Sequence, residues 1–180
     1  MPFFSQFPVL ETKRLVLREL KYDDGPDIYA YFSEGIAQYY DWLPATVPEG
    51  RGFVRYFKSG YRDKHSIRWA ITVKPRDKIA GTVGFSEFEH FSRADLGYEL
   101  AKRFWGQGLM SEALEVIIPF GFQTMGLHRI QALVVPENTA SIHLLEKFGF
   151  QKEGLLRQYN YVRHRNVWED NLIMALLREG

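Results

Sequence analysis

The stretch Arg103-Phe104-Trp105-Gly106-Gln107-Gly108-Leu109-Met110-Ser111-Glu112-Ala113 decides how the rest of the chain is interpreted. Its two glycines stand directly before a run of apolar residues at helical spacing, Met110, Ala113, Leu114 and Ile117. Residues 95–101, just ahead of it, alternate as in a strand. The expected order is therefore strand, glycine loop and helix. Free amide N–H groups in such a loop, at the positive end of a helix dipole, predict a binding site for an anion.

Two common phosphate-binding loops fit this stretch poorly. The nucleoside-triphosphate loop requires Lys-Ser/Thr after its last glycine, and Leu109-Met110 follows here. The dinucleotide fingerprint requires a third glycine, where Ser111 and Glu112 stand. The remaining pattern, Arg103-x-x-Gly106-x-Gly108, resembles the acetyl-CoA pyrophosphate loop of the GNAT superfamily of N-acetyltransferases, which reads Gln/Arg-x-x-Gly-x-Gly/Ala. Taken alone, the pattern also suits an ordinary strand-to-helix turn.

Two further motifs extend this resemblance in the expected order. Near the start, Thr12-Lys13-Arg14-Leu15-Val16-Leu17-Arg18 is typical of the RimJ/RimL-type branch of GNAT proteins. Nearer the end, Asn138-Thr139-Ala140-Ser141, followed by Gly149-Phe150, is similar to a second GNAT pattern. With Glu153-Gly154 and the apolar strand that ends at Leu177, the resemblance covers residues 11 to 178.

Composition limits the function classes. The chain has 180 residues, 46% of them hydrophobic, and no linker-like stretch, which predicts a single domain over residues 1–180. A net charge of +1, from 23 basic and 22 acidic residues, argues against nucleic acid or a membrane surface as partner. Without cysteine or a His-x-x-x-His pair, a metal site is not expected. No signal peptide or apolar span of eighteen residues is found, so a cytoplasmic protein is expected.

Local periodicity and turn residues predict the remaining elements. The first half should contain a strand in residues 11–20, a short helix in 27–32 capped by Asp23 or Asp24, a helix after Pro48, and a hairpin of strands 67–73 and 78–88. A main helix should run from Leu109 to about Met125, with a bend at Pro119. A strand in 129–135 should lie parallel to the strand before the glycine loop, and a helix should follow between Asn138 and Gly149.

An aromatic cluster at residues 39–44, Tyr39-Tyr40-Asp41-Trp42-Leu43-Pro44, is too irregular for a core helix. It is either a loop that lines a pocket or a lid over the core. The fold class that all these elements indicate is α/β, or α+β. The resemblance implies a single GNAT-like domain, whose mixed, mostly antiparallel central sheet is flanked by helices and has splayed parallel central strands.

The resemblance also implies which residues bind acetyl-CoA, the expected co-substrate. The loop would hold the pyrophosphate, and the backbone of residues 99–101 would pair with the pantetheine amides. The expected cofactor-binding residues are Leu100, Ala101, Arg103, Trp105, Gly106, Gln107, Gly108, Leu109, Met110, Asn138 and Ser141. For Asn138 a helix cap is an equally good interpretation, and for Ser141 an ordinary first-turn serine.

Catalysis requires a neutral amine, stabilisation of the carbonyl oxygen and a proton for the departing thiolate. Ser141 is the expected proton donor to the CoA sulfur. RimL-like enzymes carry a glutamate, proposed as the general base, where this chain has Asn160, and asparagine accepts no proton at neutral pH. Glu99 is the first alternative base, with Glu87, Tyr159 or a positioned water behind it. Glu99 also fits a solvent-exposed strand residue, and Asp170 a structural one.

The sequence thus predicts an acetyl-CoA-dependent N-acetyltransferase acting on a primary amine. A protein N-terminal α-amine of the ribosomal-protein type is the leading acceptor by resemblance, and a small amine such as a polyamine, aminoglycoside or amino-acid derivative is the alternative. The missing carboxylate at Asn160 keeps open a CoA-binding module without catalysis, and a pure protein-interaction domain is a third class. A homodimer is possible because some relatives dimerise.

Overall fold

Strand β5 (Arg93–Leu100) lies within an eight-stranded sheet, in the order β1-β2-β3-β4-β5-β6-β8-β7. The computed structural model describes residues 2–36, 39–40, 42–89 and 92–178. The other strands are β1 (Leu10–Glu11), β2 (Leu15–Glu19), β3 (Ile67–Val73), β4 (Ile79–Glu89), β6 (Arg129–Val134), β7 (Gln151–Val162) and β8 (Val167–Leu177). The α-helices are α1 (Gly25–Tyr31), α2 (Val47–Arg62), α3 (Leu109–Pro119) and α4 (Thr139–Lys147).

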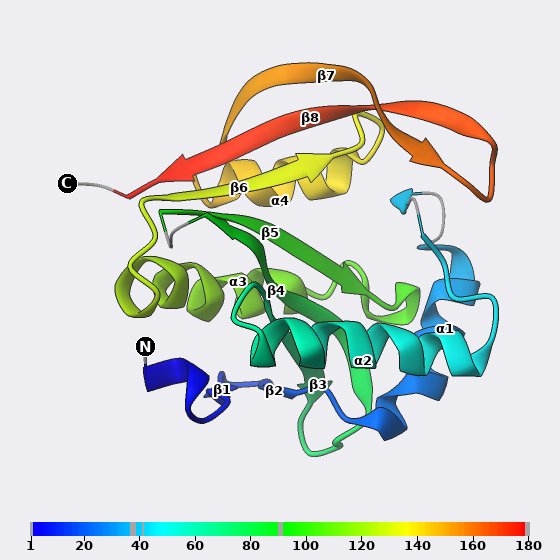
Figure 1. The fold of residues 1–180 in the computed structure, drawn as a ribbon, viewed down its shortest axis with the longest axis vertical. Helices are drawn as coiled ribbons and strands as arrows, with labels where there is room; N and C mark the ends of the chain where they lie inside the picture. Colours follow the sequence, from blue (N-terminus) through cyan, green and yellow to red (C-terminus); the bar gives the residue numbers. More distant parts are fainter. Residues whose placement is uncertain (1, 37–38, 41, 90–91, 179–180) are drawn as a thin grey trace.

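The strand pairing confirms the predicted mixed sheet. All neighbouring strands in the described sheet pair antiparallel except β5 and β6, which are parallel. The parallel pairing is short and ends at Asp95 and Gln131. Beyond that point the two strands diverge, as Figure 1 shows. The splayed central strands that the sequence predicted are therefore present.

The sheet is covered on both faces. Side chains of alternate residues of β3 enter different clusters, with Trp69 and Ile71 on the α3 side and Ala70 on the side of α1 and α2. Fully buried Leu114 and Ile117 of α3 pack in the first cluster. Burial of each such side chain stabilises the fold by about 1.5–3 kcal/mol, so the main helix is held chiefly by its apolar face.

Some element boundaries and caps differ from the prediction. The main α-helix ends at Pro119, and a π-helical segment (Phe120–Thr124) continues it toward Gly126. Proline lacks the N–H that would continue the hydrogen-bond ladder, which accounts for a change of helix type near this position. The second helix begins before Pro48, with Thr46 as its N-cap. The first strand is shorter than expected and is preceded by β1.

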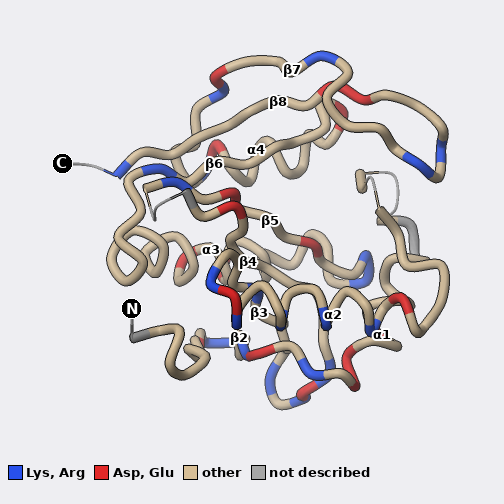
Figure 2. Tube along the Cα trace, in the orientation of Figure 1, with Lys and Arg blue, Asp and Glu red and all other residues tan. Residues whose placement is uncertain are grey.

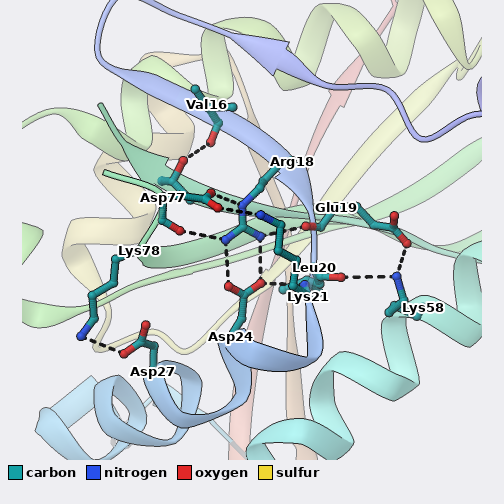
Figure 3. A network of polar contacts seen from close by, with 11 residues as sticks. Val16, Arg18, Glu19, Leu20, Lys21, Asp24, Asp27, Lys58, Asp77 and Lys78 are labelled. Atoms are coloured by element: carbon teal, nitrogen blue, oxygen red, sulfur yellow. Dashed lines mark hydrogen bonds and ion pairs between the residues drawn. The ribbon is translucent and has the colours of Figure 1, made fainter. Parts of the chain in front are cut away.

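Asp24 stands at the N-cap position of α1, as predicted, but its side chain makes no capping hydrogen bond to that helix. The Asp24 carboxylate instead accepts from the Arg18 guanidinium, at 2.9 and 2.8 Å, and from Lys21 N–H at 2.7 Å. Arg18 also donates to Asp77 Oδ1 at 2.5 Å, so one nearly buried arginine joins β2, the turn before α1 and the β3–β4 turn (Figure 3). Satisfying Arg18 takes precedence over capping, because an unpaired buried charge costs more than a lost cap.

Charged residues of both signs are distributed along the trace in Figure 2. No helix in the described ranges is both long and apolar enough to cross a membrane.

Candidate active site

The loop after β5 has the backbone geometry that its glycines predict. Gly106 and Gly108 both have φ of 70°, in the left-handed region where a side chain is disfavoured. Helix α3 begins directly after Gly108, and its first turn completes with a hydrogen bond from Glu112 N–H to the Gly108 carbonyl at 3.0 Å. Helix geometry leaves the preceding amides without intrahelical partners. The loop therefore presents backbone donors at the positive end of a helix dipole.

The N-terminal motif, residues 12–18, holds the glycine loop in place through Thr12 and Arg14. The sequence did not predict this contact. Arg14 Nε donates to Glu112 Oε2 at 2.5 Å, and Arg14 Nη1 donates to the Gln107 carbonyl at 2.9 Å. Thr12 Oγ1 donates to Glu112 Oε1 at 2.5 Å. Partial burial raises the pKa of Glu112, but these hydrogen bonds outweigh it and the pKa is lowered overall. Residues 12–14 thus hold the loop against β2, about one hundred positions away in the chain.

The free edge of β5 is set by the alternation of its backbone groups. Ala101 N–H donates to the Ala80 carbonyl of β4 at 2.8 Å, so Ala101, and with it Glu99, directs its backbone toward β4. Tyr98 and Leu100 then face the gap beside β6. Their carbonyls accept from Tyr40 Oη at 2.7 Å and from Trp105 Nε1 at 2.6 Å. Of the residues 99–101 expected to pair with pantetheine, Leu100 therefore faces the gap, whereas Glu99 and Ala101 direct their backbone groups toward β4.

A cavity of about 490 Å³ lies where the strands diverge. Its wall combines the ends of β5 and β6, the glycine loop, the start of α4 and aromatic residues Tyr39 and Tyr40. Of the sequence-predicted residues, the structure brings together Glu99, Leu100, Trp105, Gly106, Gly108, Leu109, Met110, Asn138 and Ser141.

Three predicted binding residues, Ala101, Arg103 and Gln107, are not in the cavity wall. The Gln107 side chain donates to the Arg103 carbonyl at 2.9 Å, so it stabilises the loop from outside. The Arg103 guanidinium lies over the Phe104 ring, 5.0 Å from its centroid. The backbone amides of Arg103 and Gln107 remain part of the loop, but their side chains contact neighbouring loop residues.

Asn138, at the start of α4, is both a helix cap and a residue of the cavity wall. Asn138 Oδ1 accepts from Ser141 N–H at 3.2 Å, which makes Asn138 the N-cap, and both residues also line the cavity. Gly149 follows the helix with φ of 84°, as a left-handed C-terminal glycine does. The cap fixes Ser141 at the cavity, where its hydroxyl meets the Tyr98 phenol at 2.6 Å.

Glu99 is not the solvent-exposed strand residue that the sequence also allowed, because only 3% of it is exposed. Its carboxylate is ion-paired with Arg68 and accepts from Thr82 Oγ1 and, at 3.1 Å, from Tyr31 Oη. Burial raises the pKa of the Tyr31 phenol well above its ordinary value, and the Glu99 charge adds to this. Glu99 is thus a residue of the cavity wall whose carboxylate is held in a closed polar network. The other candidate bases, Glu87 and Tyr159, are not in that wall.

The far end of the cavity is formed by β7 and β8. Asn160 and Glu169 lie opposite each other across this pair, and both line the cavity. Asp170 accepts from Gln158 N–H at 2.7 Å, next to the register shift in β7, which is a structural role. Asn171 is 3% exposed, and its Nδ2 has no hydrogen-bond partner among the described residues. No sequence signal distinguished Asn171, because its burial depends on the pairing of β7 with β8.

Known proteins match this arrangement over most of the chain. The acetyltransferase (GNAT) domain family matches residues 14–151. This chain belongs to the GNAT acetyltransferase family. The uncharacterized N-acetyltransferase YoaA of Bacillus subtilis is 39% identical over 158 residues, 86% of this chain and 89% of that protein. The [ribosomal protein uS5]-alanine N-acetyltransferase of Escherichia coli is 29% identical over 178 residues, 93% and 89% respectively.

A solved GNAT-type structure, Mycobacterium smegmatis RimJ in complex with CoA-disulfide, has the same fold. It superposes with a TM-score of 0.83 at 23% identity and covers 94% of this chain and 86% of that chain. The predicted family and RimJ/RimL resemblance are confirmed, and this GNAT protein is an acetyltransferase whose family uses acetyl-CoA. Among the residues the structure describes, no group of three metal-ligating side chains is close enough to hold a metal ion.

Proposed function

We propose that this N-acetyltransferase acetylates the α-amine of a protein N-terminus, of the ribosomal-protein type. The coarse support is the likeness to a [ribosomal protein uS5]-alanine N-acetyltransferase along nearly the whole chain. The observation that carries the proposal is the balance of charge around the cavity. That balance distinguishes an acceptor with one amine from an acceptor with several cations.

Two carboxylates, Glu99 and Glu169, lie in the described cavity wall, and each is paired with an arginine. Arg68 pairs with Glu99, and Arg165 pairs with Glu169. Neither carboxylate therefore offers an uncompensated charge to an ammonium group. A polyamine or aminoglycoside would bring several cations into a site without counter-charges, whereas an N-terminal residue brings one amine that must be neutral to react. Asp41, the acidic residue of the aromatic cluster, lies outside the described residues.

The chemistry of the amine also favours this acceptor. Deprotonating a lysine side chain with a pKa near 10.4 at pH 7 costs about 5 kcal/mol, while an α-amine with a pKa near 8 costs about 1 kcal/mol. Asn160 supplies no base at the family position. Proton uptake by Glu99 would break its buried ion pair with Arg68. We therefore assign the amine proton to a water, with Glu99 as the group that orients it.

Acetyl-CoA would be held by the backbone donors from Gly106 to Met110 at its pyrophosphate and by the free edge of β5 along its pantetheine arm. Arg103 and Gln107 support that loop, and Leu100 and Ala101 end the strand that leads into it. Asn138 positions Ser141, whose hydroxyl would donate to the thioester sulfur as the thiolate departs. A cytoplasmic location and a homodimer stay predictions.

The test compares acceptors in a thiol-release assay with acetyl-CoA. The panel contains free N-terminal peptides, the same peptides with a blocked N-terminus and one lysine, and a small-amine set with spermidine and an aminoglycoside. We expect kcat/KM for the free N-terminal peptides to be at least about 100-fold higher at pH 7, from the fraction of neutral amine alone. Faster turnover of spermidine would contradict the proposal.

The pH dependence provides an independent check. For an α-amine acceptor, log kcat/KM should rise with a slope of about one below pH 8 and then level off, because deprotonation of the amine is complete. A rise that continues to pH 10 would indicate a lysine side chain. Tight CoA binding without turnover of any amine would favour the CoA-binding module without catalysis.

A further inference from the structure

Tyr98 is a cavity residue that the sequence did not single out, although it stands next to Glu99 in the same strand. It lies three positions beyond the last β5–β6 pair, where the two strands have begun to part. Its phenol crosses the space to α4 and lies 2.6 Å from Ser141 Oγ. Its backbone carbonyl accepts from Tyr40 Oη at 2.7 Å. The residue is therefore fixed at both ends.

In the phenol–serine hydrogen bond both oxygens carry a proton, so either group can donate. Burial raises the pKa of the Tyr98 phenol to about 12, so the phenol keeps its proton at neutral pH. A hydroxyl group has one proton to donate and two lone pairs to accept with. If Tyr98 donates to Ser141 Oγ, the serine proton is free to point elsewhere. Because Ser141 lines the cavity, that direction is into the cavity.

We propose that Tyr98 is a positioning residue for the acetyl transfer, which holds Ser141 so that the serine proton points at the thioester sulfur. This inference rests on the proposed role of Ser141. The neutral amine nitrogen forms a bond to the thioester carbonyl carbon, and the carbon–sulfur bond breaks with its electron pair moving to sulfur. The serine hydroxyl donates a hydrogen bond to the forming thiolate. The amine nitrogen loses one proton and the sulfur gains one. Tyr98 and Ser141 are unchanged after turnover.

A double-mutant cycle tests whether Tyr98 acts through Ser141. Ser141→Ala should lower kcat about 100-fold, and Tyr98→Phe, which keeps the ring and loses only the phenol oxygen, about 10-fold. The KM for acetyl-CoA should change less than about twofold in both. In the double variant, kcat should fall about 100-fold rather than 1,000-fold, because without the serine the phenol has nothing to orient.

A second readout needs no acceptor amine. A hydrogen bond to a thiolate stabilises the anion, so the intact pair should lower the pKa of the bound CoA thiol. In the enzyme–CoA complex, followed by ultraviolet absorbance of the thiolate across pH, Tyr98→Phe and Ser141→Ala should each raise that pKa by about 0.5–1 unit. Tyr61→Phe is the matched control, because it removes a phenol that donates to the Phe3 carbonyl at 2.5 Å outside the cavity.

The outcomes separate this inference from the proposed acceptor. If no amine is acetylated but the thiol pKa rises in both variants, the proposed function fails and the positioning role stands. If the two kcat losses multiply and the thiol pKa is the same in wild type and Tyr98→Phe, the phenol has only a packing role and the inference is overturned. A loss of kcat in Tyr61→Phe as large as in Tyr98→Phe would also overturn it.

Discussion

Two adjacent residues of β5, Glu99 and Tyr98, face regions of the molecule with opposite character. The Glu99 side chain enters a closed region, where β3, β4 and β5 pair along most of their length and Arg68 and Thr82 reach the carboxylate. The Tyr98 side chain enters the open region, where β5 has left β6. One strand therefore supplies both a fixed wall and a binding edge.

The difference shows how the fold maintains an opening in its sheet. Pairing of β4 with β5 continues to Leu100, whereas pairing of β6 with β5 stops at Asp95. The carbonyls left on the open side still have partners, because side chains of Tyr40 and Trp105 donate to two of them. The paired strands of the closed region thus stabilise the fold. In the open region, backbone groups of β5 make hydrogen bonds to side chains, and a ligand can replace those side chains as partner.

The largest expected effect comes from breaking the closed region. Glu99→Gln keeps the shape of the side chain but leaves the Arg68 guanidinium, with a side chain only 10% exposed, without its counter-charge. We expect the free energy of unfolding to fall by about 3–5 kcal/mol, measured by urea denaturation. Activity should be measured on the folded fraction only.

Glu169→Gln is the matched control, because Glu169 also lines the cavity and also pairs with an arginine. Its partner Arg165 has a side chain 38% exposed, so loss of that pair should cost less than about 1 kcal/mol. Equal losses in the two variants would mean that the Glu99 network is no more important for stability than a surface pair. The distinction between closed and open regions would then lose its energetic basis.

A smaller effect is expected at the mouth of the open region. Gly108→Val should place a side chain over the amides at the start of α3 and raise the Kd for CoA at least about 100-fold, by calorimetry. Since φ at Gly108 is 70°, valine should also strain the backbone.

Gly126→Val separates strain from lost binding. Gly126 has φ of 75°, close to that of Gly108, but it is outside the cavity wall. A Cβ at Gly126 would meet open space, and a Cβ at Gly108 would lie 3.7 Å from Arg14 Nη2. The Gly126→Val variant should lose similar stability and keep its affinity for CoA. Equal affinities in the two variants would contradict the assignment of the loop to the pyrophosphate.

The sequence predicted those features that depend on neighbouring residues. The glycine loop, the helix that starts at Leu109 and the cap at Asn138 each follow from a few consecutive positions, and each is present. The order of strand, loop, helix and strand also predicted the parallel pair, because a crossover helix requires it. Local chemistry was sufficient for these features.

Features that depend on distant residues were missed or misjudged. The sequence left open whether Glu99 is a candidate base or an exposed strand residue, and its burial depends on Tyr31, Arg68 and Thr82. Asp24 was predicted to cap α1, but its carboxylate forms an ion pair with Arg18 of β2. Of the predicted residues 99–101, only Leu100 directs its backbone toward the gap, since successive residues of a strand face opposite edges. Pairing partners, and not periodicity, decide these points.

The smallest expected effect is on the free edge itself, at the hydrogen bond from Trp105 Nε1 to the Leu100 carbonyl. Trp105→Phe removes the donor and keeps an aromatic ring at the entrance of the glycine loop. One lost hydrogen bond is worth about 1 kcal/mol, which should weaken acetyl-CoA binding about fivefold. Trp168→Phe, on an exposed side chain of β8, is the control and should bind normally. Tighter binding by Trp105→Phe would reverse the interpretation: the indole would then compete with the pantetheine arm for that carbonyl instead of holding the loop in place for it.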